Sequence, residues 1–317
     1  MKTSITSIAK IAGGLTLLAA SSVATASVSN TAHNLSGNVN GMHLVGSTEI
    51  CIFCHTPHGA NQSVDAPIWN RAVSSTSVYT RFSTLGRLTF DAKEAPIGSV
   101  SIACLSCHDG TQARDAVINS PGTGSTGFVV GTASGVWYDG TTLSTAYLSD
   151  LVASDNGVIG DMIYLGTDLR NDHPISMQYG GGGLNTLSPT GTTRDPDFSK
   201  AATTGTGGYG ATAANNAGVG TTAGNPATTL GIATGLVIYS ANYGSNGAGP
   251  KWYVDTGTAG YQGTDFPLYT RNDAGDGLTQ PFVECATCHD PHSANSTFLR
   301  LPGGNVRSQV CLTCHAK

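Results

Sequence analysis

A five-residue motif that occurs four times constrains this chain more than any other feature. Each copy reads C-x-x-C-H, and together the four copies contain all eight cysteines of the sequence. Two thiols at this spacing can each add to one vinyl group of a haem, and the histidine that follows can bind the iron. The cysteines are Cys51, Cys54, Cys104, Cys107, Cys285, Cys288, Cys311 and Cys314, and the histidines are His55, His108, His289 and His315.

Two other uses of paired cysteines compete with haem attachment. Eight cysteines in an exported protein could form four disulfides, and C-x-x-C pairs can also hold zinc. Neither use explains a histidine after every second cysteine. Because the 317 residues include only nine histidines, four such coincidences would arise by chance roughly once in a million. The sequence therefore predicts four covalently attached haem c groups, with these four histidines as proximal iron ligands.

The first 26 residues have the features of a secretory signal peptide. Lys2 and Lys10 form a positive region, residues 11–20 are apolar, and Ala24-Thr25-Ala26 is a small-residue cleavage site. We expect residues 1–26 to be removed and the mature chain to be secreted. Further along, no run of eighteen or more apolar residues occurs, so the mature chain is not expected to span a membrane.

The composition narrows the fold and excludes one class of partner. A chain with 15 basic residues and a net charge of −5 has no basic surface for nucleic acid. Hydrophobic residues make up 39% and aromatic residues 7%, which is little material for a side-chain core. We therefore expect a multihaem cytochrome c in which the haems form the core. The chain should be mostly coil, with short helices at the haem sites and a few short β-strands.

The remaining histidines are candidates for the second axial ligand of each iron. Of the nine histidines, four are proximal ligands and five remain. Four six-coordinate irons need only four further ligands, so one histidine is in excess. The five remaining histidines are His33, His43, His58, His173 and His292. Methionine is the weaker candidate, because Met42, Met162 and Met177 lie in no repeated context. An enzyme that reduces a substrate at iron would leave an axial position open. The count therefore predicts bis-histidine haems that pass electrons, and not an enzyme.

Two of these histidines share the pattern C-H-x-P-H. His58 follows His55 by three residues, and His292 follows His289 by three. Side chains three apart lie on one side of a helical turn, whereas the axial ligands of one iron approach from opposite faces. Each would therefore serve a different haem and bring two haems close together. The alternative is a surface histidine in a turn, which the recurrence of the pattern disfavours.

The spacing suggests an iron for most of these histidines. Only 21 residues separate His289 from Cys311, so we expect His292 to complete the haem of His315. His43 can fold back toward an early haem, and His173 is expected to be a distal ligand although it lies far from every motif. His33 is the candidate for the spare histidine, because it lies close to the loose N-terminus of the mature chain.

The positions of the motifs divide the chain into four parts. These are the signal peptide at 1–26, an N-terminal dihaem module at 27–115, a haem-free middle at 116–280 and a C-terminal dihaem module at 281–317. The middle is rich in Gly, Thr, Ser, Ala and Asn, and it is too long and too aromatic for a flexible linker. Brief strands are expected at Phe128-Val129-Val130, at Gly235–Tyr239 and at Trp252-Tyr253-Val254.

The C-H-x-P-H element, the close C-terminal pair of motifs and the segment Asn171–Ile175 resemble the doubled C-x-x-C-H multihaem cytochromes. With four haems and a Gly/Thr-rich middle, the chain is most similar to outer-surface tetrahaem cytochromes that polymerise into extracellular filaments. The resemblance implies stacked haems, self-assembly, and exchange with outer-membrane cytochromes and extracellular electron acceptors. It also implies one distal histidine donated by a neighbouring subunit. His58 is the first choice for that role, and His33 and His43 are the runners-up.

Three functions are compatible with this pattern. The chain could form a polymeric extracellular conduit, act as a monomeric shuttle in the periplasm or at the outer membrane, or serve as a multihaem reductase. A reductase needs an open iron, which the excess of histidines disfavours. A small shuttle rarely needs the 176 haem-free residues between His108 and Cys285, and this favours the conduit.

Overall fold

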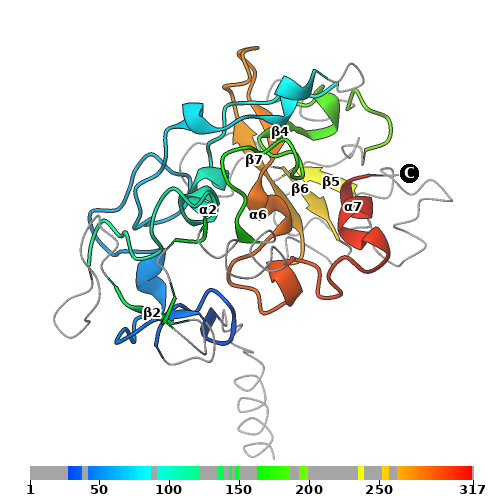
Figure 1. Ribbon diagram of the computed structural model, residues 1–317. Coiled ribbons are helices and arrows are strands. Elements are labelled where there is room, and N and C mark those ends of the chain that lie inside the picture. Colours follow the sequence, from blue (N-terminus) through cyan, green and yellow to red (C-terminus); the bar gives the residue numbers. More distant parts are fainter. Residues whose placement is uncertain are drawn as a thin grey trace, which may run out of the picture.

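The computed structural model describes residues 28–37, 42–86, 91–120, 135–138, 143–144, 147–149, 163–185, 193–198, 235–238, 252–256 and 263–315 (Figure 1). The expected signal peptide and the expected strand at Phe128-Val129-Val130 lie outside these residues. The boundaries proposed for the four parts of the chain stay predictions.

A short helical element overlies every C-x-x-C-H motif. These elements are η2 (Cys51–Phe53), α2 (Ser101–His108), α6 (Cys285–Cys288) and α7 (Gln309–Cys314). In three motifs the histidine N–H donates to the carbonyl of the first cysteine, at 2.8 Å for His55, 3.1 Å for His289 and 2.9 Å for His315. One turn of this kind brings the two cysteines and the histidine of a motif close together.

Other described turns are short 3₁₀ helices. They are η1 (Val28–Asn30), η3 (Thr76–Val78), η4 (Phe82–Leu85), η5 (Tyr179–Gly181), η7 (Ser296–Phe298) and η8 (Val306–Ser308). None of the described helices is long and apolar enough to cross a membrane.

A small three-stranded sheet lies beside the first motif. It pairs β1 (His43–Leu44) with β2 (Trp137–Tyr138) and β2 with β3 (Leu143–Ser144), all antiparallel. Leu44, Phe53 and Trp137 are buried together, so the sheet packs against the helical turn of that motif.

A five-stranded antiparallel sheet forms the larger structural unit, in the order β4-β8-β7-β6-β5. Its strands are β4 (Met177–Gln178), β5 (Gly235–Ile238), β6 (Trp252–Asp255), β7 (Phe266–Arg271) and β8 (Gln280–Val283). The strands expected at 235–239 and 252–254 thus coincide with β5 and β6. Because α6 begins two residues after β8, the sheet leads directly into the third motif.

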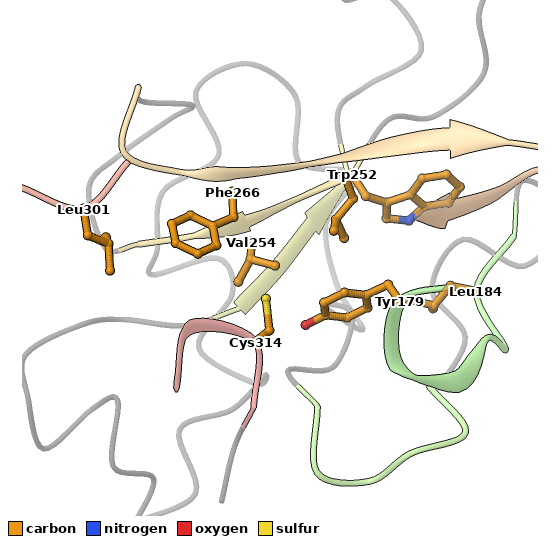
Figure 2. Close-up of a cluster of buried hydrophobic side chains, with 8 residues drawn as sticks. Tyr179, Leu184, Trp252, Val254, Phe266, Leu301 and Cys314 are labelled. Carbon is orange, nitrogen blue, oxygen red and sulfur yellow. The ribbon is translucent and has the colours of Figure 1, made fainter. Parts of the chain in front are cut away.

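The main apolar cluster lies between this sheet and the last motif. Val254 and Phe266 are fully buried, and the Cys314 sulfur points toward them from α7 (Figure 2). Burying an aromatic side chain such as Phe266 stabilises a fold by about 2–3 kcal/mol. The sheet therefore supports the last attachment site.

Attachment cysteines border all three apolar clusters of the described residues. Cys314 belongs to the cluster on the large sheet, and Cys54 packs against both of the others. The second cluster surrounds Ile102 and Leu105 of α2. The side-chain core is thus divided into small parts beside the motifs, and a haem core stays a prediction.

Candidate functional site

The histidines of the first three motifs are oriented by hydrogen bonds to backbone carbonyls. The Nδ1 atom lies 2.9 Å from the Pro67 oxygen in His55, 2.6 Å from the Ile163 oxygen in His108 and 2.8 Å from the Thr297 oxygen in His289. Metal-binding imidazoles are typically fixed in this way, because an Nδ1–H held by a carbonyl leaves Nε2 for the metal. None of the eight cysteines forms a disulfide. The donor set of each motif therefore fits haem c.

The four motifs follow one another in space in their sequence order. Cys54 of the first motif packs against the apolar cluster that contains Ile102 and Leu105 of α2, so the first two motifs are neighbours. The backbone N–H of Cys285 donates to the Ser101 hydroxyl at the start of α2, which joins the second motif to the third. Cys288 of the third motif and Cys314 of the fourth border the same apolar cluster. The attachment sites thus form one continuous row.

A buried polar network holds the second motif to the third. The Ser101 hydroxyl, at the start of α2, donates to Glu284 and accepts from the Cys285 N–H at 3.0 Å. Glu284 caps α6: the hydroxyl of Thr287 accepts the Glu284 N–H at 3.0 Å, and the Glu284 side chain bonds the backbone of Thr287 in return. One polar cluster therefore fixes the beginnings of both helices, and α2 lies against α6 (Figure 1).

Arg271 of the large sheet completes this network. Its guanidinium lies 2.9 Å from Glu284 and donates to the Ser176 hydroxyl at 3.0 Å. The Glu284 side chain is fully buried, and that of Arg271 is 7% exposed. A buried carboxylate without such a partner is strongly destabilising. The ion pair therefore ties β7 to both central attachment sites.

The end of α2, which carries His108, is also anchored. The guanidinium of Arg71 is fully buried and donates to three backbone carbonyls. Their oxygens belong to Ser106, Ala113 and Arg114, at 2.9, 2.7 and 2.7 Å. A cation is favourable at the C-terminus of a helix, where unpaired carbonyls collect. Arg71 therefore holds the last turn of α2 in place.

The structure places His292 beside the first motif rather than the fourth. The centres of the His292 and His55 rings are 6.1 Å apart, and the ring planes differ by 16°. The Asp290 carboxylate lies 3.6 Å from Nδ1 of His292 and raises the pKa of that imidazole. The assignment of His292 to the haem of His315 stays a prediction, and in this structure the ring that His292 faces is that of His55. The C-H-x-P-H turn faces the N-terminal motifs instead.

His33 lies beside the second motif. Its ring centre is 6.3 Å from that of His108. It stacks on Phe298 at 4.1 Å, and its Nδ1 lies 3.3 Å from the Pro291 carbonyl oxygen. Burial lowers the pKa of His33 to about 4, with His108 adding to the effect, so the imidazole is neutral at pH 7. A loose, spare histidine would not have these contacts.

The other predicted ligands lie in different surroundings. Desolvation by burial, with a smaller contribution from His289, lowers the pKa of His173. His43 packs on Tyr138, with ring centres 5.3 Å apart. His58 is exposed. Phe198 lies beside His315 of the fourth motif, at 4.4 Å.

Two functional contacts had no clear signal in the sequence. Phe298 supports His33, but an isolated phenylalanine carries no motif. Glu284 joins two motifs through Ser101, 183 residues away. Only the spacing of Glu284 and Thr287, which suits a reciprocal helix cap, could have drawn attention to this position.

Comparison with known families identifies the C-terminal part of this row. Residues 280–317 match the family model described as the doubled CXXCH motif. No curated protein matches the chain. The matched segment contains the third and fourth motifs and indicates a multihaem c-type cytochrome. Such a protein binds haem c covalently and transfers electrons.

Proposed function

We propose that the chain is a tetrahaem cytochrome that conducts electrons along four closely spaced bis-histidine haems. The observation that carries the proposal is the continuous row of attachment sites. Cys54 packs against the apolar cluster around α2, α2 lies against α6, and Cys288 and Cys314 border one apolar cluster. A haem at each site would have a neighbour at the next one.

Each haem, when bound, supplies an iron that cycles between ferric and ferrous states. The motif cysteines would hold the group, and the motif histidines would bind the iron through Nε2, in an orientation that Nδ1 hydrogen bonds fix in the first three motifs. Imidazole on both faces keeps the ligand set unchanged between the two oxidation states. Without an axial methionine, which raises the potential in His/Met cytochromes, relatively low reduction potentials are expected.

We further propose that the secreted protein assembles into an extracellular filament at the outer cell surface, like the outer-surface tetrahaem cytochrome OmcE. In such a filament the neighbouring subunit donates one distal histidine, and His58 is our candidate. Its side chain is exposed, and it follows the first attachment site closely. The physiological partners would be further copies of the chain, outer-membrane cytochromes and extracellular acceptors.

Replacing His58 tests the donated ligand. The variant His58→Ala should keep four covalent haems by intact mass, gain one five-coordinate iron and form no filaments in electron micrographs. Gln62→Ala, at a nearby exposed position, is the matched control and should assemble normally. Normal filaments from His58→Ala would exclude the donation.

Size and spin state separate the competing functions. A filament elutes as a very large particle on a sizing column, whereas a periplasmic or outer-membrane shuttle elutes near its monomer mass. A reductase would show a high-spin signal in the oxidised wild-type protein, because its substrate needs an open iron position.

A further inference from the structure

Two imidazole pairs in the structure join the N-terminal motifs to segments that lie elsewhere in the chain. His55 faces His292, from the turn after the third motif, with ring centres 6.1 Å apart. His108 faces His33, from the N-terminal segment, with ring centres 6.3 Å apart. In each pair, one member follows a C-x-x-C pair and the other does not.

The separation of these rings corresponds to two ligands on one iron. Metal–imidazole bonds of about 2 Å, with roughly 1 Å more from nitrogen to ring centre, place two axial imidazoles roughly 6 Å apart. Direct stacking brings rings closer, as the 4.1 Å between His33 and Phe298 illustrates. Both histidine pairs therefore have the spacing of axial ligands.

In each of the four rings Nδ1 faces an oxygen atom, which leaves Nε2 for a metal. Nδ1 faces a backbone carbonyl oxygen in His55, His108 and His33, at 2.9, 2.6 and 3.3 Å. In His292 it faces the Asp290 carboxylate at 3.6 Å. Carbonyls and carboxylates are the usual partners of metal-binding imidazoles, and all four rings keep Nε2 for iron.

We propose that His292 is the sixth ligand of the haem attached at Cys51 and Cys54, and that His33 is the sixth ligand of the haem attached at Cys104 and Cys107. The proposal rests on the proposed function, because it requires haem at these sites. It makes His33 a ligand rather than the spare histidine. It also leaves His43, His58 and His173 as the histidines for the third and fourth haems.

This assignment gives the segment 289–298 a role at three haems. His289 is the proximal ligand of the third haem, and His292 reaches the first. Pro291 and Phe298 hold His33 at the second, through its Nδ1 atom and its ring face. The segment therefore locks the N-terminal and C-terminal motifs into one cofactor array. Two dihaem modules that folded separately could not share ligands in this way.

Single substitutions in the full-length holoprotein test both ligands. His33→Ala and His292→Ala should each keep four covalent haems by intact mass. Each should convert one haem in four to a high-spin form that binds carbon monoxide when reduced and returns to low spin with added imidazole. Ser29→Ala, at an exposed position four residues before His33, is the matched control and should keep every haem low-spin. His33→Met should also stay low-spin but raise the potential of one haem.

A second experiment identifies the haem that His292 serves. In a chain that lacks the first haem (Cys51→Ala with Cys54→Ala), His292→Ala should add no high-spin iron. In a chain that lacks the fourth haem (Cys311→Ala with Cys314→Ala), the His292→Ala substitution should add one high-spin iron. The reverse result would assign His292 to the haem of His315 and overturn the proposal.

The outcomes also separate this proposal from the proposed function. A wild-type protein without four low-spin haems would contradict the proposed function itself. A wild-type protein with four such haems, together with a fully low-spin His33→Ala or His292→Ala, would overturn the assignment of that histidine alone. Should a variant lose haem or fail to fold, His33→Met and the corresponding His292→Met provide the same test through a shifted potential.

Discussion

At the scale of single residues, burial and hydrogen bonding decide what each side chain can do. The histidines of the first three motifs are fixed by backbone carbonyls, and His33, which has no motif, is fixed in the same way. Motif membership could be predicted from the sequence. The orientation of His33 could not, because it depends on Pro291 and Phe298, more than 250 residues away.

The buried pair Arg271–Glu284 leads to a stability prediction. Glu284→Gln removes a fully buried charge and should lower the free energy of unfolding by about 3 kcal/mol, because the Arg271 guanidinium, 7% exposed, then keeps only the more exposed Asp273 as a carboxylate partner. Asp273→Asn removes the other carboxylate of Arg271, which is 45% exposed, and should cost less than about 1 kcal/mol. Denaturant unfolding of the holoproteins measures both values, and equal losses would contradict the role assigned to Glu284.

At the scale of elements, the local pattern predicted helices and strands better than it predicted their contacts. Each C-x-x-C-H motif lies on a short helical turn, and the apolar runs at 235–239 and 252–254 coincide with β5 and β6. The junction between α2 and α6 was not predicted, because Ser101 and Glu284 are 183 residues apart and neither belongs to a motif. The contact between His292 and His55 was not predicted either, because sequence proximity to Cys311 favoured the fourth motif.

The end of α2 offers a test of how tightly this element is held. Gly110 follows the helix with a φ of +70°, and a Cβ atom there would lie 2.4 Å from Tyr164. Gly277 has the same φ of +70°, but a Cβ atom would meet nothing within 4 Å. Gly277→Ala should therefore cost about 1–2 kcal/mol, from backbone strain alone.

Gly110→Ala should cost clearly more than Gly277→Ala, because Tyr164 must also move. The displacement should disturb His108, two residues away, and reduce the fraction of chains that carry four haems. Denaturant unfolding and intact mass measure the two effects. Equal stability and equal haem content in the two variants would show that the end of α2 does not position His108.

At the scale of the whole molecule, the row of motifs continues from the N-terminal pair into the C-terminal pair. The polar network of Ser101, Glu284 and Arg271 joins the middle of the row, and the large sheet supports its C-terminal end through Cys314. The segment 289–298 links the C-terminal motifs back to the first two. This architecture suits transfer along the row and, with the proposed ligands in place, leaves no open iron for a substrate.

Carbon monoxide binding by the reduced protein tests most directly whether imidazole covers both faces of every haem. The absorption spectrum of the dithionite-reduced wild-type holoprotein is recorded before and after addition of the gas. Four bis-histidine haems predict a low-spin spectrum that carbon monoxide leaves essentially unchanged. A spectrum in which most of the haems take up carbon monoxide would show open irons and contradict the account.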